Sequence, residues 1–328
     1  MWKKIVFLII IFLIIVTLLT IKFSIKEQKK HYKLIAIATL MSHPALDAVI
    51  QNLKKELEME GFVENKNVKY IIRNANGQIQ LAANIANELS ALNPDVIVAV
   101  TTPMSQAIVK VARCPVVFAA VTDPVGAGLV KSLDKCEKMI TGTSDAWPYY
   151  DQLKLIKEIT PKVKVLGVLY NPGEAASQYG IKKIRYYAPK LGFKLLEGAV
   201  SSTAEVYPVA QNLASRVDAL FLSSDNTVIS GVGAALKVAI EHKIPLYVGD
   251  SGTVAKGGLA AVSVGYPELG RETGKLVARV LRGERCIPVV VARGSEIYLN
   301  LKAAELMGVS IPKEIIKKAK KIYYEIQK

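Results

Sequence analysis

Seven short clusters of Ser, Thr, Asn and Asp recur along the chain, and most of them follow a run of aliphatic residues. The clusters lie at 41–44, 101–105, 121–124, 141–145, 171–174, 223–227 and 249–251. Their hydroxyl, amide and carboxylate groups can bind a polar ligand, although each cluster alone could equally cap the helix that follows it. Seven clusters together favour a polar binding cleft.

Two of the clusters suit the carboxylate of a zwitterionic ligand. Thr101, Thr102 and Ser105 begin a predicted helix, and Thr122 ends the neighbouring predicted strand. The N-terminus of a helix offers unpaired N–H groups and a partial positive charge, both of which bind a carboxylate. We therefore expect the carboxylate of such a ligand to bind here.

The ammonium of such a ligand needs an anionic partner, because a charge-assisted hydrogen bond is about twice as strong as a neutral one. Asp225 is the leading candidate, and Asp145 and Asp250 are alternatives. If the two ends of the ligand bind to different parts of the protein, binding is coupled to the closure of these parts around the ligand. The remaining candidate binding residues are Ser42, His43, Asp123, Ser144, Asn171, Glu174, Asn226 and Thr227.

Motifs for catalysis, cofactors and metals are poorly represented. The segment 142–146 is not a Gly-x-Ser-x-Gly elbow, since Ala146 replaces the last Gly. The segment 231–236 lacks the third Gly of a dinucleotide-binding loop, no P-loop occurs, and the chain has only 3 His. We expect no enzymatic activity, no cofactor and no bound metal.

The cysteines are Cys114, Cys136 and Cys286. Their odd number and their spacing support neither a zinc ribbon nor a disulfide framework. We expect them to be free and to pack as small apolar side chains.

The net charge of +15 is concentrated at the two ends of the chain. Residues 1–33 carry +6, residues 313–328 carry +4, and the body between them carries only +5. No zinc-finger spacing or arginine-rich stripe accompanies this charge, so we expect no nucleic-acid partner. Lysine-rich ends next to an anionic membrane account for it more simply.

An uncharged, mostly aliphatic run extends from residue 5 to residue 21. As a helix its 17 residues reach about 25 Å, within the range of a membrane span. No small-residue cleavage site and no Cys for lipid attachment follow it. We therefore expect residues 1–23 to be an export segment or membrane anchor, with a polar linker over 24–32. The lysines after the run would by themselves favour the opposite orientation, but large domains obey that rule weakly.

From residue 33 onward, β-branched runs alternate with amphipathic stretches, which is the pattern of a parallel sheet covered by helices. The predicted strands are 34–40, 68–73, 95–100, 116–120, 164–170, 194–199, 218–222, 245–248 and 258–264. The predicted helices include 45–60, 78–91, 148–159, 203–214 and 266–282. Gly61 and Gly192 are the kind of residue that ends a helix.

An internal repeat predicts two similar lobes. Residues 33–62 and 164–193 align without a gap over 30 residues, and both begin with Lys before an aliphatic run and end in Gly-Phe. Ligands of such sheets bind outside the carboxyl ends of the strands. Two lobes that face each other there would form a cleft walled by the polar clusters.

Several segments carry a resemblance to a known family. They are SHPALD at 42–47, NAN at 74–76, VTTP at 100–103, VFAAVTDPV at 117–125, GTSD at 142–145, GVLYN at 167–171 and SDNTV at 224–228. In order and spacing, from about residue 33 to 312, the chain resembles the tryptophan/tyrosine-type substrate-binding proteins of bacterial ABC transporters. The resemblance implies the type I periplasmic-binding fold. This is an α/β fold of two Rossmann-like parallel-sheet lobes with a ligand cleft between them, here preceded by an N-terminal hydrophobic helix.

We expect the parts of the chain to be arranged as follows. Lobe 1 spans 33–143 plus about 267–295, lobe 2 spans 144–266 plus about 296–312, and 313–328 form a basic amphipathic tail helix.

These expectations describe the extracytoplasmic receptor of an ABC importer, exported and possibly anchored to the membrane, which binds an amino acid and delivers it to a permease. The preference for an aromatic amino acid is mainly implied by the resemblance. A membrane-tethered ligand sensor, or a receptor for another small polar ligand such as a sugar or nucleoside, are the alternatives. Apolar surface for a ring could come from Met41, Pro44, Met104, Tyr170, Trp147 and Tyr149.

Overall fold

The computed structural model describes residues 2, 13–17, 32–135, 139–292 and 294–327. The predicted export or anchor segment and the linker after it therefore lie mostly outside the described residues, and residues 13–17 of the segment are helical. Among the residues that are described, we find no helix with both the length and the apolar character needed to cross a membrane.

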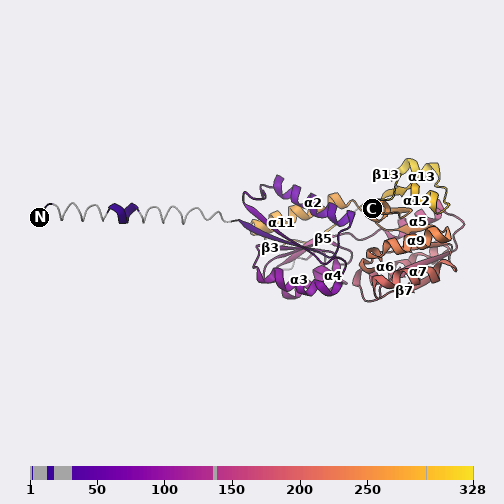
Figure 1. The fold of residues 1–328 in the computed structure, drawn as a ribbon, viewed down its shortest axis with the longest axis horizontal. Coiled ribbons are helices and arrows are strands. Elements are labelled where there is room, and N and C mark those ends of the chain that lie inside the picture. The colour runs from indigo at the N-terminus through magenta and orange to yellow at the C-terminus, as the bar shows by residue number, and fades with distance from the viewer. Residues whose placement is uncertain (1, 3–12, 18–31, 136–138, 293, 328) are drawn as a thin grey trace.

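Lobe 1 is built around a six-stranded parallel sheet in the described part of the chain, with the order β11-β5-β4-β3-β1-β2. Helices α2 and α11 cover one face of this sheet and α3 and α4 cover the other (Figure 1). The central strands are buried along their whole length, as expected for parallel strands covered on both faces. The elements are β1 Lys33–Thr39, α2 Pro44–Met59, β2 Val68–Asn74, α3 Ile79–Ala91, β3 Val96–Val100, α4 Thr102–Val111, β4 Val116–Val121, β5 Ile140–Ser144, α11 Tyr266–Leu281 and β11 Val290–Val291.

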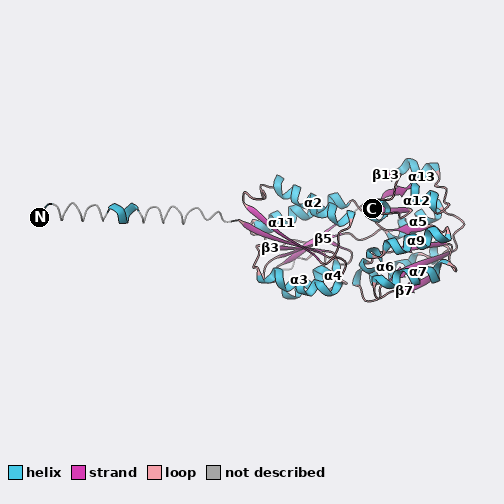
Figure 2. Cartoon of the chain, in the orientation of Figure 1, coloured by secondary structure: helices cyan, strands magenta, loops and turns pink. Residues whose placement is uncertain are grey.

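Lobe 2 contains a parallel sheet with the order β7-β6-β8-β9 and a smaller sheet with the order β10-β12-β13. Helices flank the strands of both sheets (Figure 2). Its strands are β6 Val165–Tyr170, β7 Lys194–Ala199, β8 Ala219–Leu222, β9 Leu246–Val248, β10 Ala260–Ser263, β12 Glu296–Asn300 and β13 Ala319–Tyr323. Its helices are α5 Tyr149–Ile159, α6 Ala175–Tyr187, η1 Pro189–Leu191, η2 Thr203–Glu205, α7 Val206–Ala214, α8 Asn226–Ser230, α9 Val232–His242, α10 Ser251–Ala255, α12 Leu301–Leu306 and α13 Lys313–Lys318.

The two lobes are not consecutive in the sequence. The described chain passes between them three times, after β5, before α11 and after β11. Helix α11 returns to lobe 1 and packs along α2, while β11 pairs with β5 at the edge of the lobe 1 sheet. The predicted α/β class with parallel sheets in two lobes is confirmed.

Three details of the sequence prediction were wrong. The segment 140–144 was not among the predicted strands, but it forms β5, where Gly142 leaves room for Phe118. The tail is not one helix, because α13 ends at Lys318 and Ala319–Tyr323 pairs with β12. Cys286 is exposed and disulfide-bonded rather than free and apolar, whereas Cys114 is free and half-buried.

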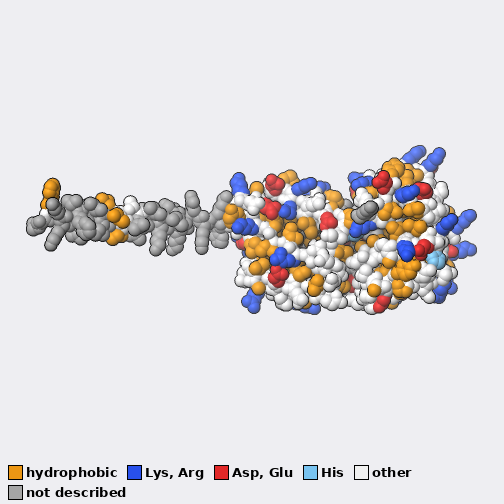
Figure 3. Space-filling view, in the orientation of Figure 1, with side chains coloured by type: hydrophobic (Ala, Val, Ile, Leu, Met, Phe, Trp, Pro, Cys, Tyr) orange, Lys and Arg blue, Asp and Glu red, His pale blue; other side chains and the backbone are white. Residues whose placement is uncertain are grey.

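The charge of the body is dispersed. On the face drawn in Figure 3, Lys and Arg side chains are spread over both lobes among acidic and apolar ones. About half of the ion pairs between described surface residues join neighbouring elements, such as Arg73 with Glu88 and Arg185 with Glu197. Pairs of this kind contribute little to stability in water.

Close contact between α2 and α11 depends on two glycines of α11. A Cβ at Gly270 would lie 2.5 Å from the carbonyl oxygen of Val49, and one at Gly274 would lie 2.9 Å from that of Leu53. Both neighbours are backbone atoms, which cannot move without displacing α2. The spacing of four residues puts both glycines on the same face of α11.

We predict that Gly270→Ala lowers the free energy of unfolding by roughly 1–3 kcal/mol, because the added methyl group forces the two helices apart. Urea unfolding of the variant and the wild type measures this difference. Gly233→Ala in α9 is the matched control, since a Cβ there meets no atom within 4 Å. Equal midpoints for the two variants would contradict the predicted cost of separating the helices.

Candidate ligand-binding cleft

A cavity lies between the lobes, where the carboxyl ends of the two main parallel sheets face each other. Its walls come from the loops after β1, β3, β4 and β5 of lobe 1, from those after β8 and β9 of lobe 2, and from the first residues of α2, α6, α8 and α11. The cavity and its mouth contain about 460 Å³ that no protein atom fills, of which about 50 Å³ can hold the centre of a water-sized sphere. The lobes touch around it, so the space is narrow.

The structure brings together eight of the candidate binding residues on the walls of this cavity. They are His43, Thr101, Thr102, Thr122, Asp145, Asp225, Asn226 and Asp250. All of them except Asn226 are buried. These residues come from polar clusters far apart in the sequence, which the parallel topology places at one edge of each sheet.

Seven other candidates do not line the cavity, and several of them form hydrogen bonds that support the backbone around it. Ser105 and Ser144 donate hydrogen bonds to backbone carbonyls, and Asp123 accepts one from the N–H of Gly126. Glu174 accepts from the first N–H groups of α8. The seven residues are Ser42, Ser105, Asp123, Ser144, Asn171, Glu174 and Thr227.

Thr101 combines backbone strain with an unsatisfied hydroxyl. Its φ of 84° lies in the left-handed region, which a β-branched residue rarely adopts. The side chain is buried, and its Oγ1 finds no hydrogen-bond partner among the residues that the structure describes. It precedes α4, whose first N–H groups have no acceptor within the helix. A ligand oxygen in the cavity could satisfy both the hydroxyl and these N–H groups.

Asp145 lies where the chain first leaves lobe 1, and it is held by hydroxyl groups. Thr122 donates to Oδ1 over 3.2 Å and Tyr266 donates to Oδ2 over 3.1 Å. No Lys, Arg or His in the described ranges forms an ion pair with it. Burial raises the pKa of Asp145 to about 6, against the lowering effect of these hydrogen bonds. The carboxylate is therefore an anionic group without a cation.

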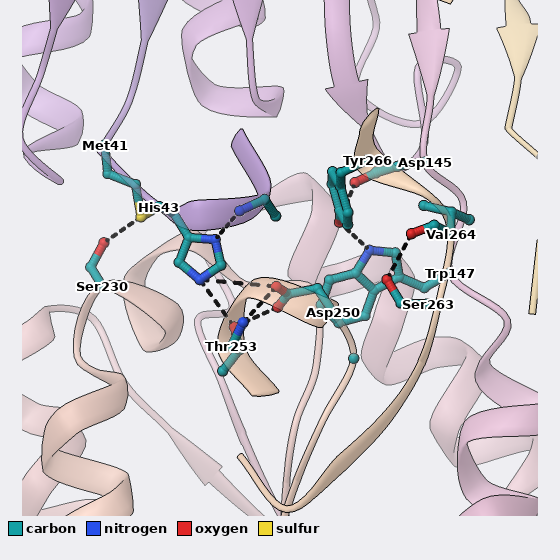
Figure 4. A network of polar contacts seen from close by, with 12 residues as sticks. Met41, His43, Asp145, Trp147, Ser230, Asp250, Thr253, Ser263, Val264 and Tyr266 are labelled. Carbon is teal, nitrogen blue, oxygen red and sulfur yellow. Dashed lines mark hydrogen bonds and ion pairs between the residues drawn. The ribbon is translucent and has the colours of Figure 1, made fainter. Parts of the chain in front are cut away.

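The hydrogen-bond network around Asp145 reaches the first two crossings of the chain and both lobes. Trp147 donates from Nε1 to the hydroxyl of Tyr266 over 3.3 Å, and the hydroxyls of Thr122 and Ser224 are 2.8 Å apart across the cleft (Figure 4 shows Asp145, Trp147 and Tyr266). Tyr266 stands at the second crossing of the chain. A group bound at Asp145 would thus contact a network that changes when the lobes move.

Asp225 and Asp250 cap helices of lobe 2. Asp225 accepts from the N–H of Val228 over 2.8 Å and from the N–H of Asn171, so both of its oxygens are occupied by backbone donors. Burial, and then the negative charge of Glu174, raise the pKa of Asp225 to about 6. Asp250 accepts from the N–H of Thr253 over 2.8 Å and also from its hydroxyl.

The apolar part of the wall combines predicted and unpredicted residues. Met41 and Trp147 line the cavity, and Gly249 leaves room for the indole ring of Trp147. The other predicted apolar residues, Pro44, Met104, Tyr170 and Tyr149, do not line it. The residues that the sequence analysis missed are Ala45, Leu46, Ala120, Ala176, Ser224, Ile229 and Tyr266. Ser224 lies within a polar cluster, and Tyr266 follows a predicted strand. Their positions after strand ends could therefore have identified both as candidates.

The described residues contain no group of three or more His, Cys, Asp or Glu side chains arranged to hold a metal ion.

Comparison with known proteins gives concordant matches. The family described as "ABC transporter substrate binding protein" matches residues 34–323. A tyrosine-binding protein of Clostridioides difficile (strain R20291) is 35% identical over 291 residues, which cover 87% of this chain and 84% of that protein.

Two solved structures have nearly the same sequence identity to this chain but superpose on it to different degrees. An ABC domain from Streptococcus pneumonia in complex with L-Trp is 34% identical, with a TM-score of 0.85 over 89% of this chain and 99% of that one. The ligand-free, open structure of a substrate-binding protein with adhesive properties from Clostridium difficile is 33% identical, with a TM-score of 0.67 over 89% of this chain and 100% of that one.

We predict that Asp145→Asn stabilises the ligand-free protein at pH 8 by roughly 1–3 kcal/mol more than at pH 4. The pKa of this carboxyl is higher in the folded state, about 6, than its ordinary value of 3.8. Its ionisation therefore costs stability that is lost as the pH rises through 4 to 6, and Asn does not ionise. Urea unfolding at both pH values measures the difference, with Asp134→Asn on the surface as control. A stability difference that is the same at both pH values would contradict this account.

Proposed function

The chain belongs to the family of ABC transporter substrate-binding proteins, and from this premise we propose that it is the receptor of an ABC importer that closes its two lobes around an aromatic amino acid. Proteins of this family act outside the cytoplasm. The observation that carries the proposal is that two groups without a matching partner among the described residues line one cavity. They are the hydroxyl of Thr101 at a helix N-terminus and the buried carboxylate of Asp145, which has no cation.

The arrangement of the lobes supports a receptor that can adopt a closed form. At nearly equal identity, the structure is much closer to the complex with L-Trp than to the open, ligand-free protein. Direct contacts between the lobes, such as that between Thr122 and Ser224, agree with this interpretation. A narrow cavity between two lobes that touch can remove much of a small ligand's surface from water.

In the proposed complex the ligand carboxylate binds at the N-terminus of α4 and at Thr101. We assign the ammonium to Asp145 rather than to Asp225, the leading candidate from the sequence. Both oxygens of Asp225 already accept backbone N–H groups, whose direction is fixed. The donors to Asp145 are hydroxyls, which can rotate to share the carboxylate with a third donor.

The aromatic preference rests on the wall of the cavity and on the relatives. Trp147, Tyr266, Met41 and Leu46 offer flat or flexible apolar surface to a ring. Among the similar proteins, one is a tyrosine-binding protein and another holds L-Trp. An aromatic amino acid satisfies both the polar and the apolar part of the cavity.

Export and delivery to a membrane permease are part of the proposal. The disulfide at Cys286 supports an oxidising, extracytoplasmic compartment, because disulfides rarely persist in the cytosol. The apolar run over 5–21 would direct export and would tether the body at the membrane, close to the permease.

We expect tryptophan, tyrosine or phenylalanine to bind at least ten times more tightly than alanine, because burying a ring contributes about 1.5–3 kcal/mol. Calorimetry on the purified full-length protein measures the affinities. Tight binding of a hexose or a nucleoside, with none for any amino acid, would refute the proposed ligand class. Alanine binding as tightly as tryptophan would refute only the aromatic preference.

We expect Asp145→Ala to weaken binding of the preferred amino acid by roughly 2–5 kcal/mol, since the ligand ammonium loses its charged partner in a buried site. Asp134→Ala, at an exposed position, should leave the affinity unchanged. Calorimetry compares the two with Asp225→Ala. If Asp145→Ala binds like the control while Asp225→Ala does not, the ammonium belongs to Asp225.

A further inference from the structure

The N-terminus of α2 in lobe 1 meets the N-terminus of α10 in lobe 2 beside the cavity. His43 caps α2, with Nδ1 accepting from the N–H of Ala45 over 3.4 Å. Its Nε2 lies 3.2 Å from the hydroxyl of Thr253 and 3.9 Å from Asp250, both in lobe 2 (Figure 4). The ring is 4% exposed, so the contact between the lobes is tight here.

Gly252 is the residue of α10 that lies against His43 and the first turn of α2. A Cβ at this position would lie 2.6 Å from Cε1 of His43, 2.7 Å from the backbone nitrogen of Ala45 and 3.0 Å from Nδ1 of His43. The three nearest atoms thus all belong to the opposite lobe. Contacts below 3 Å cannot be accommodated without movement, and the nitrogen of Ala45 is part of the α2 backbone.

We propose that Gly252 allows the lobes to close, because the absence of a side chain leaves room for His43 and the first turn of α2. In this way Gly252 sets the ligand affinity of the protein. It is a positioning residue, because it does not line the cavity itself. The inference rests on the proposed function, in which closure completes the binding site. If a side chain filled this space, the α2 end of the cleft would remain open to water, and the ligand would contact one lobe only.

The need for glycine comes from closure and not from the fold of lobe 2. Gly252 lies within the helix α10, where its conformation is one that alanine also adopts. In a helix, alanine is favoured over glycine. A methyl group at this position therefore affects lobe 2 little and obstructs only the approach of lobe 1.

The test compares Gly252→Ala with Gly233→Ala in the full-length protein, with the aromatic amino acid that the wild type binds most tightly as probe. Both variants replace a glycine in a helix of lobe 2, but a Cβ at Gly233 meets no atom within 4 Å. We expect Gly252→Ala to raise the Kd at least tenfold and Gly233→Ala to leave it unchanged. Thermal unfolding of the ligand-free variants should show no loss of stability for Gly252→Ala.

A second measurement separates closure from other causes of weak binding. In a Cys114→Ser background, which removes the free thiol, spin labels at Lys55→Cys and Lys162→Cys, on exposed positions of the two lobes, report the distance between the lobes. Saturating ligand should change this distance in the wild type and in Gly233→Ala, and should fail to change it in Gly252→Ala.

The outcomes are distinct. If Gly252→Ala binds within twofold of Gly233→Ala, or if its lobes close normally, the role of Gly252 is overturned while the proposed function stands. If the wild type binds no amino acid, the proposed function fails and the inference fails with it.

Discussion

An ionised carboxylate removed from water must be neutralised by a proton or by a cation, and Asp145 is under this constraint at the point where the lobes join. Burial raises its pKa, and among the described residues the side chains that donate hydrogen bonds to it are hydroxyls rather than cations. Burying this carboxylate costs stability. The end of β5 positions it, and hydroxyls from the turn after β4 and from the start of α11 donate hydrogen bonds to it. In the proposed complex the ligand ammonium is the cation that pairs with this carboxylate, so recognition and stability oppose each other at one residue.

Among the described residues, few hydrogen bonds join the two lobes around the cavity. The hydroxyls of Thr122 and Ser224, the ring of His43 with Thr253, and the hydroxyl of Ser230 with the sulfur of Met41 join the two sides. Water can replace each of these partners when the lobes separate, so the contacts alone favour the closed form only weakly. The equilibrium between open and closed forms is then set by whatever occupies the cavity.

The strands of the main sheets could be predicted because aliphatic runs such as Val96–Val100 are buried on both faces and are too short for helices. Strand β5 was missed because its residues, Ile140–Ser144, are mostly polar or Gly. They suit a strand only through distant contacts, such as the hydroxyl of Thr143 with that of Thr273 and the space left for Phe118 by Gly142. The tail was mistaken for a helix because its apolar spacing suits one, while pairing with β12 decides the conformation of Ala319–Tyr323.

The polar clusters predicted which segments line the cavity, but they did not predict the role of each residue. Asp225 caps a helix through the N–H of Val228, three residues away, which is a local pattern that sequence reveals. The partners of Asp145 are 23 and 121 residues away, and no local pattern announces them. Choosing among the aspartates therefore required the three-dimensional arrangement.

The return of α11 and β11 to lobe 1 also fixes the order in which the chain can acquire its structure. Helix α11 covers α2, and β11 completes the sheet beside β5, although lobe 2 residues intervene between β5 and α11. During synthesis, lobe 1 lacks one of its covering helices until residue 281 has emerged, by which time most of lobe 2 is already available. Contacts over such long sequence separations form slowly. An incomplete first lobe keeps the nascent chain unfolded for longer, which is the condition in which a polypeptide can be threaded through a membrane.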